Sequence, residues 1–302
     1  MRSFLPIAAA SSLLAQAPPP SPPPPPPPSV LGFALTGSAT LGSQYIWRGL
    51  TQTDGKPTIQ GEVDLAHPSG FYLSLGLSNI SWYTDQNAGF ASAPVSLGSP
   101  GAVGAPLYSP GKVNSAALEL DLWGGYKWGF AKDWTLDLGL FRYLYPGNYE
   151  NVGAFRPPHS TEAYLGVSYS WASLKYSRAI SQNFMGVYRA LGTSYIDLSL
   201  NIPLGGSGFT LLLHGGRTTY PSNANPDFFF NGKTLTGDNS QFSYSDYKVG
   251  VSKEIAGATF ALAYTDANSR GRASDHDLPV YENAMGRNLG GGRGTLTISK
   301  AF

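Results

Sequence analysis

The stretch ALELDLWGGYKWGFAKDWTLDLGL, residues 117–140, decides the fold. Apolar side chains occupy every second position within 118–122 and again within 134–140, and acidic residues such as Glu119 and Asp121 stand between them. A period of two belongs to a strand with one apolar and one polar face. The stretch therefore predicts two strands joined by a short turn.

The same alternation continues from residue 30 to the end of the chain and predicts about twelve strands, with helical periodicity nearly absent. The predicted strands cover residues 33–48, 57–66, 71–79, 115–127, 134–144, 161–171, 172–179, 195–203, 209–220, 242–254, 258–266 and 293–302. The connections alternate between short turns, at 67–70, 128–133, 171–172, 204–208 and 255–257, and longer loops, at 49–56, 80–114, 145–160, 180–194, 221–241 and 267–292.

This rhythm of connections indicates an all-β protein, a transmembrane antiparallel up-and-down β-barrel with short periplasmic turns and long extracellular loops. A soluble β-sandwich would instead show Greek-key connections of mixed length. The composition agrees, since 42% of residues are hydrophobic and only 13% are charged. No stretch reaches the roughly 18 consecutive apolar residues that a membrane-spanning helix needs.

Charge and cysteine content exclude several other classes. The net charge is +1 and basic runs are absent, which excludes a nucleic-acid partner because phosphate backbones require a concentrated basic surface. The chain contains no cysteine and therefore no disulfide framework or thiolate metal site. We expect no cofactor and no metal.

The N-terminus indicates export. Arg2, the apolar residues 4–15 and the small residues Ala15 and Ala17 predict a signal peptide over residues 1–17, cut after Ala17 or after Ala15. Residues 18–29 are almost entirely proline and predict a stiff periplasmic spacer. This spacer is either an inert linker or a segment that contacts the cell wall or a partner there. Residues 30–302 would form a barrel in the outer membrane of a Gram-negative bacterium.

The chain ends on an aromatic residue, Phe302, with Leu296 and Ile298 in step on the same strand face. This ending resembles the C-terminal strand of bacterial outer-membrane proteins, whose last aromatic is recognised by the barrel-insertion machinery. The expected partners are therefore that machinery, outer-membrane lipid and lipopolysaccharide.

A family resemblance rests on a signature near the N-terminus: Tyr45, Trp47, Arg48, Gly49, Gln52, Pro57, Gln60 and Gly61. Further matches follow along the chain, including Glu119 and Asp121 in the fourth predicted strand. In these positions the chain resembles the TorF family of porin-like proteins over residues 33–302. The resemblance implies an outer-membrane channel, while the polyproline spacer and the longer loops depart from the family pattern.

The strand faces also predict what lines the lumen. Opposite the apolar face lie eight acidic and four basic residues: Glu62, Asp64, Glu119, Asp121, Asp137, Glu162, Asp197 and Asp246, and Arg48, Lys127, Lys175 and Lys248. An acidic excess attracts cations, so we expect passive diffusion of small polar solutes or ions with a weak cation preference. Glu62 and Arg48, on neighbouring predicted strands, are the pair expected to interact.

Aromatic residues near the strand ends predict the two girdles of a membrane barrel, although parity turns Tyr143 and Tyr145 toward the lumen. The outer girdle would contain Tyr45, Trp47, Tyr143, Tyr145, Tyr176 and Tyr220, and the inner one Phe71, Trp134, Tyr169, Trp171 and Phe209.

Three alternatives stay open. Twelve strands fall between barrels that side chains fill and barrels that hold a wide channel, so the lumen charges would pair with each other in a non-conducting barrel. Such a barrel would anchor surface loops, for example residues 86–111, for adhesion or receptor function. The third alternative, a lipid hydrolase using His67 and Ser69, has the least support because these residues fall in a short periplasmic turn.

Overall fold

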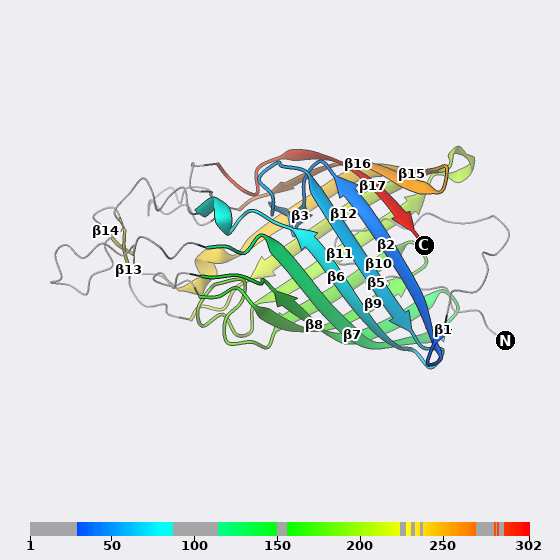
Figure 1. Cartoon of the computed structure of the whole chain (residues 1–302), viewed down its shortest axis with the longest axis horizontal. Coiled ribbons are helices and arrows are strands. Elements are labelled where there is room, and N and C mark those ends of the chain that lie inside the picture. Colours follow the sequence, from blue (N-terminus) through cyan, green and yellow to red (C-terminus); the bar gives the residue numbers. More distant parts are fainter. Residues whose placement is uncertain are drawn as a thin grey trace.

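The computed structural model describes residues 29–86, 114–149, 156–223, 228–230, 233–235, 238–269, 281, 283 and 287–302. Over these ranges the chain forms one closed antiparallel β-barrel of 12 long strands (Figure 1). The predicted signal peptide, the polyproline segment up to residue 28 and residues 87–113 of the longest loop lie outside the described residues.

The barrel strands follow each other around the ring in chain order, and β17 pairs with β2 to close it. This arrangement confirms the predicted fold class. The strands are β2 (Phe33–Gly42), β5 (Thr58–Ala66), β6 (Phe71–Asn79), β7 (Leu118–Ala131), β8 (Trp134–Leu144), β9 (Ser160–Tyr169), β10 (Ala172–Ala179), β11 (Ser194–Pro203), β12 (Phe209–Thr219), β15 (Tyr244–Ile255), β16 (Ala258–Ala267) and β17 (Arg293–Ala301).

The remaining elements are short. Strand β1 (Ser29–Val30) extends the sheet beside β2, while β3 (Ile46–Trp47) pairs with β4 (Leu50–Thr51) and β13 (Phe228–Phe230) with β14 (Lys233–Leu235). The described helical turns are η1 (Thr84–Gln86), η2 (Gly205–Ser207) and η3 (Asn239–Phe242). Among the described residues, no helix is long and apolar enough to cross a membrane.

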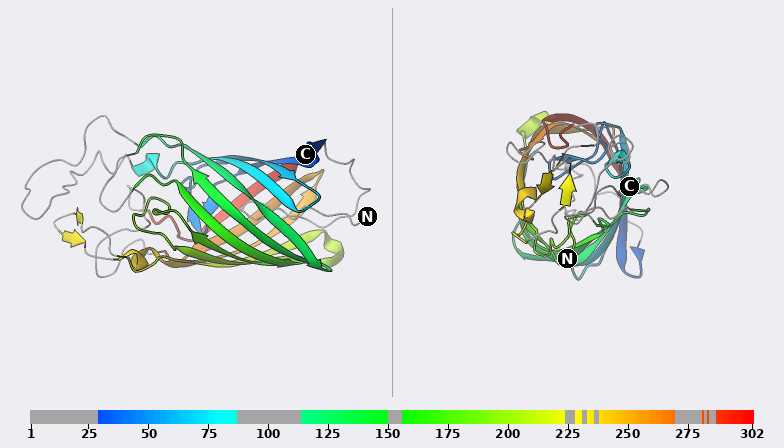
Figure 2. Two further views of the ribbon diagram at one scale, coloured as in Figure 1. Left: turned by 90° about the horizontal axis from the view of Figure 1, so that it is seen from below. Right: turned by 90° about the vertical axis from the view of Figure 1, so that its left-hand side faces the viewer.

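The two ends of the barrel differ. The short turns and the C-terminus lie at one end, here called the turn end, and the long connections lie at the other, the loop end (Figures 1 and 2). Left-handed backbone makes these turns tight, as at Asp133 (φ 63°) and Gly257 (φ 74°). The observed rhythm of connections is therefore the one that the sequence predicts.

Side chains alternate between the outside and the inside of the barrel. Outward leucines stay exposed, for example Leu73 at 46%, Leu140 at 54% and Leu262 at 60%, whereas inward neighbours such as Ser74 are buried. Apolar side chains face outward from strand after strand, a far more extensive apolar surface than soluble monomers expose. The outer face is thus suited to lipid and the inner face to water and ions.

The strand ends require two corrections. The first strand ends at Gly42 and not at residue 48, because the chain leaves the wall and turns inward after Ser43, whose backbone N–H donates to the Leu296 carbonyl (2.8 Å). The fourth strand begins at Leu118 and not at residue 115, and it runs on to Ala131, with an irregularity in its pairing between Gly129 and Ala131. The other ten predicted strands agree with the structure to within two residues.

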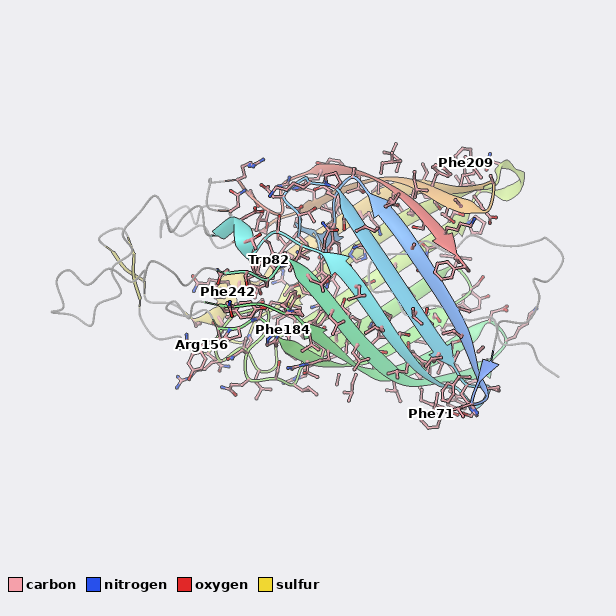
Figure 3. All side chains as sticks on the ribbon, viewed as in Figure 1. Phe71, Trp82, Arg156, Phe184, Phe209 and Phe242 are labelled. Atoms are coloured by element: carbon pink, nitrogen blue, oxygen red, sulfur yellow. The ribbon has the colours of Figure 1, made fainter. Side chains whose placement is uncertain are left out.

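Only one of the two predicted aromatic girdles is present as expected. At the turn end the predicted residues are exposed on the outer face, and Figure 3 shows Phe71 and Phe209 there. At the loop end Tyr176 is exposed, but Tyr45, Trp47 and Tyr220 face the interior and are buried or partly buried. Tyr143 and Tyr145 are buried in the interior, as their parity predicts.

Candidate functional site in the barrel lumen

Residues 44–53 form a hairpin that folds into the barrel, here called the lumen hairpin. Strands β3 and β4 pair through Ile46 with Thr51 and Trp47 with Leu50. The tight turn places Arg48 (φ 45°) and Gly49 (φ 78°) in the left-handed region, which favours glycine at the second position. The sequence predicts a strand to residue 48 followed by an outer loop over 49–56, and this prediction is wrong.

The lumen hairpin contacts strands on several sides of the barrel. The Tyr45 hydroxyl donates to Glu119 of β7 (2.6 Å), and the Trp47 ring lies 5.8 Å from the ring of Tyr143 on β8. Burial and the neighbouring Glu119 raise the pKa of Tyr45 well above its ordinary value, so the hydroxyl remains a neutral donor.

Farther along the hairpin the contacts reach the opposite wall. Leu50 packs with Tyr244 of β15 and Ala267 of β16. A Cβ at Gly49 would lie 2.4 Å from the Cβ of Asp246 and 2.9 Å from that of Ala267, so the backbone touches this wall directly. The lumen hairpin therefore lies across the barrel interior.

Arg48 anchors the hairpin in a buried ion pair. Its Nη2 donates to Glu162 Oε2 at 2.7 Å, and the two side chains are 7% and 1% exposed. The guanidinium carbon lies 4.4 Å from the Trp47 ring centre and 4.2 Å from that of Tyr195, within cation–π range. The Tyr143 hydroxyl donates to the same carboxylate oxygen at 3.0 Å.

The predicted pairing of Arg48 with Glu62 was therefore wrong. The predicted first strand included Arg48 and placed it next to Glu62 on the second, whereas the inward turn brings Arg48 to Glu162 of β9. Burial acts to lower the pKa of Arg48, but the Glu162 carboxylate raises it above its ordinary value. The guanidinium consequently stays charged.

A second polar cluster surrounds His214 on β12. Its Nε2 lies 2.8 Å from Asp246 Oδ1 and 3.0 Å from the Tyr195 hydroxyl, and its Nδ1 lies 3.5 Å from Asp197 Oδ1. The Ser199 hydroxyl donates to Asp197 at 2.7 Å. The acids on this wall are thus engaged by a histidine and by hydroxyl groups.

A third cluster centres on Asp137 of β8. The Tyr72 hydroxyl donates to Asp137 at 2.7 Å and also contacts the Tyr164 hydroxyl. Lys127 Nζ lies 4.3 Å from the Tyr72 ring centre, and Lys175 Nζ lies 3.9 Å from that of Tyr164. Tyr72 and Tyr164 are therefore in contact with each other, Tyr72 bonds the Asp137 carboxylate, and each tyrosine ring lies near one lysine.

The twelve charged residues predicted to line the lumen occupy two kinds of position. Arg48 reaches the interior through the lumen hairpin, whereas the other eleven lie on barrel strands on the inward face. Parity within each strand gives this orientation. Several inward aromatic residues were not predicted as lumen residues, although the same parity identifies them: Tyr72, Trp123, Phe141, Tyr164 and Tyr195.

Loop segments also pack into the loop end of the lumen. Ile80 and Tyr83 follow β6 and belong to a buried cluster with Tyr45. Phe184 and Val187 follow β10 and belong to a second one, against which Trp47 packs. Figure 3 shows Trp82 and Phe184 at this end of the barrel. The hairpin and these loop segments therefore both occupy the loop end of the lumen.

The family-signature residues lie in or beside the hairpin. Tyr45, Trp47, Arg48 and Gly49 make the contacts described above. The Gln52 carbonyl accepts hydrogen bonds from the backbone N–H groups of Ser81 (2.8 Å) and Trp82 (3.1 Å). Pro57 follows the hairpin, and Gln60 and Gly61 lie on β5.

The proximity of His67 and Ser69, the candidate hydrolase residues, is explained by the turn in which they lie. His67 Nδ1 lies 2.7 Å from Ser69 Oγ and accepts a hydrogen bond from the Ser69 backbone N–H at 3.2 Å. Both contacts close the exposed turn between β5 and β6, as short polar side chains commonly do. Within the described ranges, no group of three or more His, Cys, Asp or Glu side chains is arranged to hold a metal ion.

A closed barrel with an apolar exterior and a charged interior defines a membrane β-barrel of the channel-like class. The chain belongs to the Gcw_chp family, described as bacterial proteins of unknown function, whose model matches residues 28–302. A comparison with curated protein sequences gave no match.

Among solved structures, the chain is similar to the KdgM porin (8% identity, TM-score 0.46, covering 88% of this chain and 99% of that one). It is also similar to the NanC porin (9%, TM-score 0.43, 89% and 98%) and to the Pseudomonas putida toluene transporter TodX (9%, TM-score 0.42, 90% and 89%). Identities and scores of this size leave substrate and function open.

Proposed function

We propose that the protein is a narrow outer-membrane channel for passive diffusion of small polar solutes or ions, with a weak preference for cations. The observation that carries this proposal is the row of charged side chains on the inner face of a barrel whose outer face is apolar. Charged linings retain water in a pore, and eight acids against four bases favour cations.

The lumen hairpin argues for small permeants. Buried contacts hold it between β7 and β16, and the loop segments around Ile80 and Phe184 pack beside it. A wide general-diffusion pore is incompatible with an obstruction of this kind, whereas a narrow passage for ions or small solutes remains compatible with it.

Location and orientation belong to the same proposal. The signal-peptide pattern, the apolar outer face and the terminal Phe302 support insertion into a Gram-negative outer membrane, with the turn end in the periplasm. The TorF-like signature in residues 45–61 adds the expectation of a porin. The polyproline segment would then extend into the periplasm, where it is free to contact the cell wall.

The test is electrical recording from the purified protein in planar bilayers. We expect discrete single-channel steps and, in a KCl gradient, a reversal potential that shows preference for K⁺ over Cl⁻. Absence of conductance would contradict the channel, and anion preference at neutral pH would contradict the selectivity. Replacing KCl by salts of larger organic ions would then measure the width of the passage.

The packed loop end favours a second candidate, a non-conducting barrel that anchors surface loops for adhesion or reception. Under this alternative the buried clusters around Tyr83 and Phe184 hold the loop bases rather than narrow a passage. Deleting residues 86–111 would then abolish binding to a surface or ligand, whereas in a channel it would alter only the conductance.

A further inference from the structure

One side of the lumen contains a small polar cavity. Side chains and backbone of β2, β5, β6 and β7 line it, among them Thr40, Gln60, Glu62, Ser78, Asp121 and Trp123. The cavity measures about 10 Å³, which is near the smallest space that holds one water molecule. It therefore suits a single water or an ion of similar size.

Two buried polar atoms at this cavity lack hydrogen-bond partners within the described part of the chain. Gln60 is 5% exposed and Asp121 is 6% exposed, and the atoms concerned are Gln60 Nε2 and Asp121 Oδ1. Buried groups in this state cost free energy unless a water or a ligand satisfies them. The same small cavity is thus lined by the residues that carry the Gln60 Nε2 donor, the Asp121 Oδ1 acceptor and the Glu62 carboxyl group.

Acids on the other walls of the lumen have basic or hydroxyl partners, whereas Asp121 Oδ1 has no hydrogen-bond partner among the described residues. Glu162 pairs with Arg48, Asp246 with His214, and Asp137 accepts from Tyr72. By contrast, Glu62 and Glu119 are the charged neighbours that act on Asp121, and both are acidic. Four acidic side chains therefore lie on this wall, Glu62 and Asp64 of β5 and Glu119 and Asp121 of β7, and the basic Lys127 of β7 is near Glu62 and Asp64.

The lumen hairpin touches this wall near the start of β7, where the Tyr45 hydroxyl donates to Glu119. Its other contacts include residues of β8, β9, β11, β15 and β16, and Gln44 Nε2 donates to the Gly294 carbonyl of β17 at 3.0 Å. The residues lining the cavity come from the barrel strands.

We propose that Glu62 and Asp121 form the cation-selecting site of this channel, with Gln60 as a donor to a water carried by the ion. The ligand class is a small monovalent cation close to water in size, such as K⁺, Rb⁺, Tl⁺ or ammonium. This inference rests on the proposed channel function. Carboxylate oxygens supply the negative field that discriminates against anions.

The first experiment measures the K⁺/Cl⁻ permeability ratio of Asp121→Asn and Glu62→Gln in planar bilayers. Each variant should lower the ratio by roughly three-fold or more, because one charge is removed at short range. Asp133→Asn in a turn and Glu254→Gln at an exposed strand end are matched controls that should leave the ratio unchanged. Heat-dependent gel mobility checks that each variant forms the barrel.

Asp197→Asn, a lumen acid on the other wall, tests whether the site is local. The proposal expects a smaller change than for Asp121→Asn, since Asp197 is already engaged by Ser199 and His214. Equal reductions from Asp197, Asp121 and Glu62 variants would overturn the local site while leaving the channel function intact.

A second experiment separates the site from the channel. Crystals of the protein soaked in thallium(I) acetate should show anomalous scattering beside Asp121 and Glu62, and the Asp121→Asn protein should lose it. Scattering at that position in a protein that conducts no current would support the site and contradict the channel. Conduction without thallium at that position would contradict the site alone.

Discussion

At the scale of single residues, Arg48 and Glu162 form a buried ion pair. The charge of each partner offsets the free-energy cost of burying the charge of the other. Their side chains are almost fully enclosed, and Arg48 is also held between the rings of Trp47 and Tyr195. Removing one partner of a buried pair leaves an uncompensated charge in a poorly solvated site. The hairpin anchor is therefore sensitive to either substitution.

We predict that Arg48→Ala lowers the free energy of unfolding by about 3 kcal/mol, since Glu162 is left buried without its cation. Urea unfolding followed by tryptophan fluorescence in detergent measures the change. Arg217→Ala is the matched control, because Arg217 is an exposed arginine on β12 whose loss should cost less than about 0.5 kcal/mol. Equal losses in the two variants would contradict a buried anchor.

Alternation alone predicts which way a strand residue faces, and this explains how much of the lumen lining could be predicted. Glu119 and Asp121 are inward because Leu118, Leu120 and Leu122 must be outward. The partners were not predictable in the same way. The partner of a lumen residue depends on where its strand lies around the barrel. For Arg48 it also depends on a turn that takes the residue out of its predicted strand.

At the scale of elements, the lumen hairpin depends on one position without a side chain. Gly49 has φ 78° and packs against Asp246 and Ala267. Gly55 has a similar φ of 76°, but no described atom lies within 4 Å of the place that a Cβ would occupy there. An alanine at either position would therefore meet similar backbone strain, and the two positions differ in packing. A comparison of the two isolates the effect of the contact.

We predict that Gly49→Ala lowers the free energy of unfolding by about 2 kcal/mol more than Gly55→Ala, because an added methyl forces the hairpin away from β15. In bilayers the same variant should show a larger single-channel conductance than Gly55→Ala. Identical stability and conductance for the two variants would show that the hairpin does not pack against this wall.

The sequence did not reveal the hairpin because residues 43–48 continue the appearance of a strand. Tyr45 and Trp47 stand at alternate positions and resemble rim aromatics of a membrane barrel. The departure comes from the turn at Arg48 and Gly49 and from the contacts with distant strands. Long-range contacts of this kind leave no periodic pattern in the sequence.

At the scale of the whole molecule, the last residue occupies a special place. The backbones of Phe302 and Gly37 exchange two hydrogen bonds of 2.9 Å, while 77% of the Phe302 residue surface is exposed. The finished barrel therefore gains little from burying this ring. A role for the ring before the barrel is complete agrees with the insertion signal inferred from the sequence.

We predict that Phe302→Ala reduces the amount of barrel inserted in the outer membrane several-fold and changes the stability of the inserted protein by less than about 0.5 kcal/mol. Heat-dependent gel mobility of membrane fractions measures insertion, and urea unfolding measures stability. Phe209→Ala, an exposed aromatic of the turn-end girdle, is the control that should insert normally. Normal insertion of Phe302→Ala would refute the signal.

The seam between β2 and β17 has a consequence for the rate at which the molecule assembles. It joins Ser38–Gly42 to Thr297–Ala301, and the Thr40 and Ser299 hydroxyls that meet across it are 259 residues apart in the chain. Every other barrel ladder joins strands that follow one another along the chain, so those ladders form with little loss of chain entropy. The β2–β17 ladder is the one barrel ladder that needs the first and the last barrel strands to be in place, and its closure is expected to be the slow, final step of folding.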